Sequence, residues 1–223
     1  MFRARLRFLL IPNYAPRFLQ QEVDMDTERP YDLVHCGSLT ETRGSRILLE
    51  MLRILVYEMG RGDLRLLVIG KGTERANRDL REGLNQYGLV RNVEFRGYIP
   101  LQQVPQALAQ AKIGLLCAQS TPEFLDDYSH SSKMFDYMAA GLPMISGTVD
   151  ISRSYDPQEE FVCFVDQANP REYARAAATL LDDDSRRIQM GRRAREIYEE
   201  KYTAEKPAEA LIEYYRECLD HGR

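Results

Sequence analysis

The sequence predicts an α/β fold with a Rossmann-like, doubly wound sheet of six parallel strands. From Tyr31 onward, short apolar runs alternate with amphipathic stretches, and several of the runs end in glycine. The run at residues 66–69 is apolar at every position, which is typical of a parallel strand covered on both faces. Strands that alternate with helices specify a parallel sheet with right-handed crossovers, and we expect the strand order 3-2-1-4-5-6.

The apolar runs define the expected strands in chain order. Each run is short enough to be one strand of a compact sheet. The six expected strands are residues 32–37, 64–70, 93–97, 112–117, 142–147 and 161–165.

The amphipathic stretches define the expected helices. Residues 45–59 carry apolar side chains at helical spacing, with charged residues on the opposite side. Residues 131–140 begin with serines, which can cap a helix, and are followed by Gly141 and Pro143, which end one. Further helices are expected at residues 73–87, 101–111, 171–181, 185–201 and 207–219.

Residues 1–26 do not follow this alternation. They predict a strand at residues 7–11, a turn at Pro12 and Asn13, and then a linker. We interpret residues 1–26 as the remnant of an upstream domain with its linker, and residues 27–223 as the Rossmann-like domain. The apolar run at residues 8–11 is too short for a signal peptide, and no stretch approaches the ~18 to 20 apolar residues of a membrane span.

The composition excludes several classes of protein. A chain of 223 residues allows one large domain but not two of full size, and its hydrophobic share of 44% is typical of a soluble globular protein. A net charge of −4 with no dominant basic stripe argues against nucleic-acid binding. The four cysteines form no Cys-x-x-Cys pair and the three histidines are scattered, which argues against a zinc site and favours reduced cysteines in the cytoplasm.

In an open parallel sheet, ligands bind beyond the carboxyl ends of the strands, near the point where the strand order reverses. The loop at residues 37–44 offers Gly37, where a backbone can approach a ligand closely, and Arg43, which stands just before a helix. An anion there could contact both the guanidinium group and the helix amides. Taken alone, a glycine at such a place is more often a plain turn residue.

The loop after the fourth strand is more informative. Ser131 and Ser132 could cap a helix whose backbone amides bind a diphosphate. Asp136 shares a helix face with Ser132 and Lys133, and its carboxylate could accept two hydrogen bonds from a ribose diol. Taken alone, such an aspartate is more often a solvated helix residue, and such serines are more often plain caps.

Several blocks of this sequence resemble the family-4 (group 1) glycosyltransferases. The block SSKMFDYMAAGLPMIS at residues 131–146 resembles the family signature of a lysine, an apolar pair, an acid and then Tyr-Met-Ala-Ala-Gly-x-Pro. The loop GSLTETRG resembles the family's Gly-Arg-Leu-x-x-x-Lys-Gly loop, and LRLLVIGKG and NVEFRGYIP match the next two blocks in order and spacing. Together the blocks extend from about Leu9 to Cys218, and their conjunction is far more specific than any one of them.

The resemblance implies the carboxyl-terminal, donor-binding half of a GT-B fold, in which two Rossmann-like domains face each other across a cleft. It implies an acceptor-binding domain upstream or in a separate partner subunit, towards which the helix at residues 207–219 would lean. The implied reaction is retaining, metal-independent and cofactor-free transfer of a hexosyl group from a nucleoside diphosphate sugar, in surface polysaccharide or glycoconjugate synthesis. Little activity is expected without the acceptor domain. The implied location is cytoplasmic, with peripheral contact to the inner face of the membrane through the acceptor.

The resemblance also assigns roles to individual positions. Arg43 would contact the donor diphosphate and act as the catalytic cation, and Asp136 would hold the ribose. The backbone of Tyr98 and Ile99 would contact the base. The remaining donor-binding positions would be Gly37, Ser38, Lys71, Tyr128, Ser129, Ser131, Ser132 and Lys133.

Three positions depart from the family pattern. Ser38 stands where an arginine is usual, which removes one phosphate anchor. Asp136 is one methylene shorter than the usual glutamate, and Tyr128 stands in place of the first acid of the Glu-x7-Glu motif, which leaves the contacts to the donor sugar open. Asp126 and Asp127 are adjacent and form no Asp-x-Asp metal motif, so we expect no metal ion.

Two other functions stay open from the sequence. The chain could be a non-catalytic donor-binding subunit of a split transferase, or a fragment of a GT-B sugar-nucleotide epimerase. The epimerase chemistry needs carboxylates and histidines in the cleft, and this half offers few. Five arginines could contact anionic lipid, but a solvated helix face balanced by nearby acids is favoured. They are Arg186, Arg187, Arg192, Arg193 and Arg195.

Overall fold

The computed structural model describes residues 9, 11–17, 29–40, 44–117, 132–147 and 150–221. Within these residues, six parallel strands form one sheet in the order β3-β2-β1-β4-β5-β6, which confirms the predicted strand order. The strands are β1 (Tyr31–Cys36), β2 (Leu66–Ile69), β3 (Val93–Gly97), β4 (Ala111–Leu116), β5 (Met144–Gly147) and β6 (Val162–Val165).

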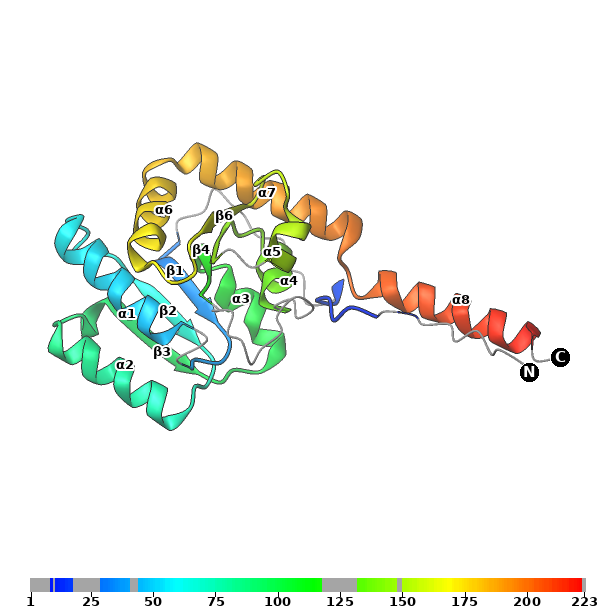
Figure 1. Cartoon of the computed structure of the whole chain (residues 1–223), viewed down its shortest axis with the longest axis horizontal. Helices are drawn as coiled ribbons and strands as arrows, with labels where there is room; N and C mark the ends of the chain where they lie inside the picture. The colour runs from blue at the N-terminus through cyan, green and yellow to red at the C-terminus, as the bar shows by residue number, and fades with distance from the viewer. Residues whose placement is uncertain are drawn as a thin grey trace.

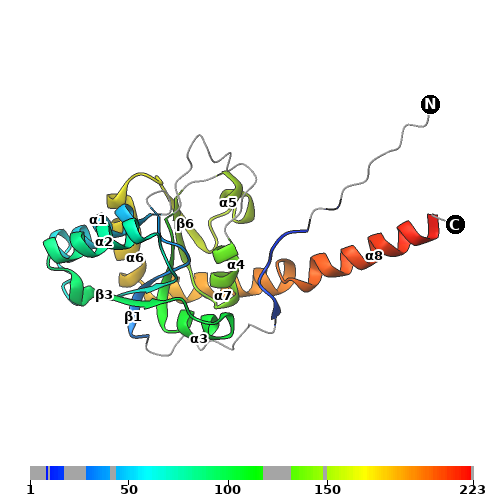
Figure 2. The same cartoon turned by 90° about the horizontal axis from the view of Figure 1, so that it is seen from below.

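Helices cover both faces of the sheet (Figures 1 and 2). On one face lie α1 (Ser45–Arg53), α2 (Glu74–Gln86) and α6 (Pro170–Asp182). On the other face lie α3 (Val104–Leu108), α4 (Ser132–Ala139) and α7 (Asp184–Lys201). The remaining helical elements are α5 (Asp150–Tyr155), α8 (Glu205–His221), a π-helical turn η2 (Ile54–Glu58) and the 3-10 turns η3 (Val90–Asn92) and η4 (Leu101–Gln103).

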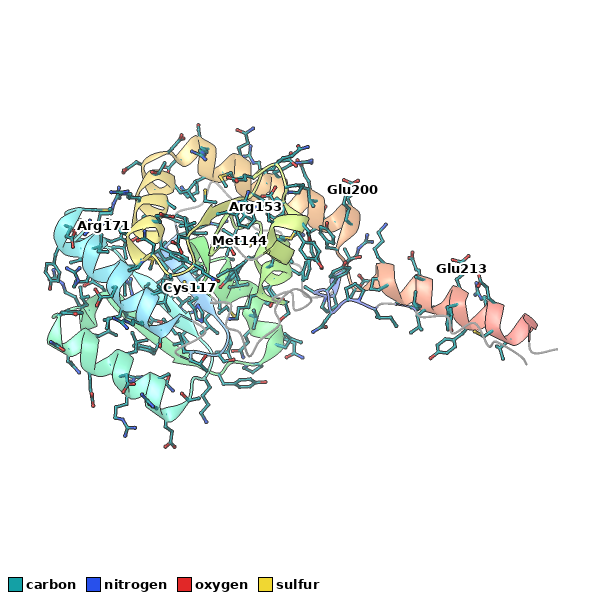
Figure 3. All side chains as sticks on the ribbon, in the orientation of Figure 1. Cys117, Met144, Arg153, Arg171, Glu200 and Glu213 are labelled. Atoms are coloured by element: carbon teal, nitrogen blue, oxygen red, sulfur yellow. The ribbon has the colours of Figure 1, made fainter. Side chains whose placement is uncertain are left out.

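The side chains of each strand alternate between two apolar cores, because successive residues of a strand point to opposite faces of the sheet. Leu33, Leu66 and Ile113 pack towards α1, α2 and α6. Val34 and Leu67 pack towards α3, α4 and α7. Figure 3 shows the buried Met144 and Cys117 inside this body. Two full apolar layers account for a sheet that is buried over most of its length.

Several details differ from the sequence expectation. The helix expected at residues 101–111 is instead the 3-10 turn η4 followed by the short helix α3, which ends at Leu108, and Ala111 begins β4. The helix expected at residues 45–59 changes after Arg53 into a π-helical turn, in which Met59 N donates to Ile54 O at 3.0 Å. Three consecutive apolar residues in that turn are all buried. Of the strand expected at residues 7–11, the structure describes Leu9 and Ile11, and both are exposed and outside any strand.

Helix α8 projects from the globular body (Figures 1 and 2), and Glu213 in Figure 3 marks its middle. Large apolar side chains stand exposed along it, namely Ile212, Tyr215 and Leu219. None of the helices in the described ranges combines the length and the apolar character that crossing a membrane requires.

Candidate functional site

The carboxyl edge of the sheet presents bare backbone at the ends of β1 and β2. Gly37 N donates to Ile69 O at 2.8 Å, and Gly70 N donates to Gly97 O at 2.7 Å, so the ladder continues just past the strands. Gly37 has a φ of +129° and Gly70 a φ of +118°, which disfavour any other residue. A Cβ atom on Gly70 would lie 2.7 Å from the carbonyl carbon of Gly37. Glycine is therefore required where these two loops meet.

The strand order reverses between β1 and β4, and the two strands separate there. Their paired register ends at Val34 and Gly114, although β1 continues beside β2 as far as Cys36. The hydroxyl of the buried Tyr137 fills the gap: it accepts from Cys36 N at 2.9 Å and lies 3.3 Å from Leu115 O and 3.4 Å from Val34 O, to either of which it can donate. This side chain of α4 thereby links the two strands where their pairing ends.

The ring of Tyr137 also explains a glycine in a central strand. A Cβ atom on Gly114 would lie 2.7 Å from a ring carbon of Tyr137. Sequence reasoning did not select Tyr137, although it directly follows Asp136 in the signature block. The signal that could have identified Tyr137 is a polar hydroxyl on a side chain of α4 that faces the apolar core, where it needs a hydrogen-bond partner.

Gly44, just before α1, and Cys117, just after β4, meet at the same point. A Cβ atom on Gly44, the residue that begins α1, would lie 2.5 Å from the carbonyl oxygen of Cys117. Cys117 directly follows β4 and is buried (Figure 3). Arg43 itself lies outside the described residues, but its neighbour Gly44 stands at the reversal of strand order, where the sequence placed the binding site.

Lys133 reaches across this edge and lies over Gly37. A Cβ atom on Gly37 would lie 2.9 Å from the Nζ atom of Lys133. Burial raises the pKa of Cys36 and of Cys117 to about 12, and the positive charge of Lys133 opposes the rise at both thiols. The structure thus brings together Gly37 and Lys133, two predicted site residues that are far apart in the sequence.

A buried histidine lies beneath this lysine. His35 has no solvent exposure, and burial followed by the charge of Lys133 lowers its pKa to about 3. The backbone groups of Ser38 and Leu115 act in the opposite direction. The imidazole is therefore neutral at physiological pH. No sequence pattern singles out His35, because its position under the site depends on the packing of β1 against β4.

Asp136 points into a small pocket with apolar walls. The carboxylate is half-buried, and burial raises its pKa from the ordinary 3.8 to about 6, while the positive charge of Lys133 opposes the rise. No hydrogen bond or ion pair joins its oxygens to another residue in the described part of the chain. The pocket is narrow, with a cavity volume of about 10 Å³, enough for about one water molecule, and it is lined by Asp136 and by Ala15, Leu101, Val104, Pro105, Leu108, Ala139 and Ala140.

The other predicted residues lie around this edge. Lys71 follows β2 and Tyr98 follows β3, and both side chains are exposed, Tyr98 by 80%. Ile99 is partly buried against the core on the α4 side, and Ser132 is exposed at the start of α4. Ser38 is half-buried in the loop after β1.

Some predictions cannot be placed. Arg43, Tyr128, Ser129 and Ser131 lie outside the described residues, as do Asp126 and Asp127. Within the described ranges, no group of three or more histidine, cysteine, aspartate or glutamate side chains is arranged to hold a metal ion.

Three of the five arginines of α7 form ion pairs with acidic side chains. Arg187 lies 2.6 Å from Asp184, Arg193 lies 2.8 Å from Glu160, and Arg195 lies 2.5 Å from Glu199. These pairs agree with the balanced helix face that the sequence favoured over a lipid-binding patch.

A family model described as glycosyl transferase-like matches residues 45–213. No curated protein gave a significant match.

Similar folds occur in solved structures. Sucrose-phosphate synthase from Thermosynechococcus elongatus is 19% identical, with a TM-score of 0.77 over 95% of this chain and 52% of that chain. HepE of Anabaena, in complex with UDP-glucose, is 14% identical, with a TM-score of 0.76 over 93% of this chain and 57% of that chain. The C-terminal domain of the group 1 glycosyl transferase LpcC from Francisella tularensis is 17% identical, with a TM-score of 0.65 over 85% of this chain and 96% of that chain.

The covered share of each matched structure shows which part of that structure this chain corresponds to. The chain spans about half the length of the synthase and of HepE, but nearly all of the LpcC domain. At such identities the structures show the fold, and the family model shows the family. The chain therefore belongs to the glycosyl transferase-like family, and it has the Rossmann-like fold of the carboxyl-terminal half of a group 1 GT-B glycosyltransferase.

Proposed function

We propose that this domain binds a nucleoside diphosphate sugar and supplies the donor side of a glycosyl transfer reaction. The observation that carries the proposal is the carboxylate of Asp136, which is desolvated in an apolar pocket without a hydrogen-bond partner among the described residues. A carboxylate in such a place is costly to the free protein. The two hydroxyls of a ribose would give it two charge-assisted hydrogen bonds and would offset that cost.

The diphosphate would lie beside this pocket, over the bare backbone at the end of β1. The ammonium group of Lys133 lies over Gly37, and Ser132 begins α4, whose first backbone amides have no partner within the helix. We assign the diphosphate to Lys133, to these amides and to Arg43. Tyr98 and Ile99, which follow β3 at the same edge, would contact the base. The complex of HepE with UDP-glucose supports a donor of this class.

The proposed chemistry is retaining transfer of a hexosyl group. The bond between the anomeric carbon and the diphosphate oxygen breaks, the bond to the acceptor oxygen forms on the same face, and the acceptor hydroxyl gives up its proton. Negative charge grows on the leaving diphosphate while the sugar becomes oxocarbenium-like. Cationic groups that are fixed in advance stabilise that charge, and removing one such group typically costs ~10² to 10³ in rate. We propose that Lys133 and Arg43 supply this stabilisation without a metal ion.

The acceptor side lies beyond this domain. We propose that an upstream domain or a partner subunit binds the acceptor, in the synthesis of a surface polysaccharide or glycoconjugate. The exposed apolar side chains of α8 are available for contact with it. On this view, the isolated chain binds the donor but transfers sugar weakly or not at all.

A binding panel tests the proposal directly. Calorimetry and thermal unfolding with UDP, GDP, ADP and their sugars should identify at least one ligand, and saturation at 100 times its Kd should stabilise the chain by ~2.7 kcal/mol. Asp136→Ala and Lys133→Ala should each weaken binding at least about tenfold. Matched controls are Asp79→Ala on α2, where the side chain is exposed, and Lys112→Ala at the amino-terminal end of β4, at the opposite edge of the sheet, where Lys112 pairs with Asp32. No binding by the wild type, or equal binding by all variants, would refute the proposal.

A further inference from the structure

The segment at residues 11–17 lies outside the Rossmann-like core, yet it contributes to the pocket of Asp136. Residues 11–16 form neither helix nor strand. Ala15 is nevertheless only 7% exposed, and it lines the same pocket as Asp136. Because the other walls come from η4, α3 and α4, this segment is the part of the wall that the sheet and its crossover helices do not supply.

Hydrogen bonds hold the segment against the corner between α7 and α8. The carbonyl oxygen of Ala15 accepts from the hydroxyl of Tyr198 at 2.5 Å and from Ala204 N at 3.2 Å. Arg17 N donates to the Glu205 carboxylate at 3.1 Å. Each of these partners belongs to the carboxyl-terminal part of the chain, so the segment is tied to the base of the projecting helix (Figure 1).

An aromatic cluster links the segment to α4. The ring of Tyr14 lies 4.6 Å from the ring of Phe135 and 5.4 Å from that of Tyr202, both in edge-to-face geometry. Tyr155 closes the cluster at 5.3 Å from Phe135 and 5.2 Å from Tyr202. Phe135 directly precedes Asp136, so the ring contact with Tyr14 lies next to the residue of α4 that carries the pocket carboxylate.

We infer that segment 11–17 is a positioning element of the donor pocket: docked, it completes the wall beside Asp136 and fixes α4, and undocked, it lowers the affinity for the nucleotide. The identity of the ligand rests on the proposed function, whereas the role of the segment goes beyond it. Such coupling is reciprocal, so a bound nucleotide must also hold the segment in place. The segment thereby connects the donor pocket to whatever precedes residue 11.

The first test fills the pocket from the segment side. Ala15→Leu should lower the affinity for the best nucleoside diphosphate among UDP, GDP and ADP at least about tenfold, measured by calorimetry. Ala208→Leu makes the same substitution at an exposed position of α8 and should leave the affinity unchanged within about twofold. Equal affinities of the two variants would overturn the inference.

The second test uses the wild-type chain and therefore does not depend on how a variant folds. Hydrogen exchange of the amides in residues 11–17 should slow when the nucleoside diphosphate is added, and Tyr14→Ala should weaken binding about threefold or more and reduce this protection. If the wild type binds the nucleotide but exchange in the segment does not change, the inference fails while the proposed function stands. If the wild type binds none of the three nucleotides, the proposed function fails and the inference fails with it.

Discussion

The desolvated carboxylate of Asp136 makes a prediction about stability that needs no ligand. Replacing it by asparagine keeps the shape of the side chain and removes the charge. Each pKa unit corresponds to ~1.36 kcal/mol, so a rise from 3.8 in the unfolded chain to about 6 in the folded domain amounts to about 3 kcal/mol. This value is the upper limit of the stability that Asp136→Asn can gain, because the asparagine amide that replaces the carboxylate is itself buried in the pocket.

The size of the effect depends on pH. The folded state has the higher pKa, so the ionised aspartate lowers wild-type stability progressively as pH rises from about 4 through about 6. Asp136→Asn should therefore be nearly equal to the wild type at pH 4 and more stable at pH 8. For a domain of this size, ~1 kcal/mol corresponds to roughly 2–4 °C in Tm, so the gain at pH 8 should be at most about 6–12 °C.

Thermal and urea unfolding of both proteins between pH 4 and pH 8 measures this difference. Asp79→Asn, on the exposed side of α2, serves as the control, and it loses only a surface ion pair with Arg75 that is worth ~0.3–0.5 kcal/mol. A stability difference between the wild type and Asp136→Asn that does not change with pH would show that water reaches the carboxylate freely, and the argument for a ligand-binding role of Asp136 would lose its basis.

Three further predictions concern the same edge of the sheet. Gly37→Ala should weaken nucleotide binding in calorimetry, because the new methyl group would displace Lys133. It should also destabilise the chain by about 1–3 kcal/mol in urea unfolding, because φ is +129° at this position. Unchanged binding would contradict the placement of Lys133. Tyr137→Phe should cost about 1–3 kcal/mol in urea unfolding, because it leaves the buried amide of Cys36 unpaired, and an unchanged unfolding midpoint would argue against this hydrogen bond. Removing divalent metals with EDTA, or adding Mg²⁺, should leave the nucleotide Kd unchanged, and a loss of binding in EDTA would refute the metal-independent site.

Much of the fold could be predicted because its signals are local. A short, uninterrupted apolar run such as residues 66–69 indicates a buried strand, and an amphipathic stretch such as residues 171–181 shows the helical period. The crossover rule then limits the order of the strands. The π-helical turn after Arg53 and the short helix α5 were not predicted, since neither leaves a distinct period in so few residues.

The site was harder to predict because its contacts join distant parts of the chain. The loop position of Gly37 and the helix position of Lys133 follow from local patterns, but their contact depends on how α4 packs across β1 and β4. The roles of His35 and Tyr137 depend on the separation of those two strands. Ala15 was assigned to a linker, because an irregular segment carries no periodic signal that shows where it docks.

The hydroxyl of Tyr137 has one more consequence for this domain. By bonding the main chain of β1 where β4 turns away, it locks α4 to the sheet at a fixed depth. A helix held in this way cannot slide to suit ligands of different size. On the proposed function, selection among nucleoside diphosphate sugars would then rest with residues outside α4.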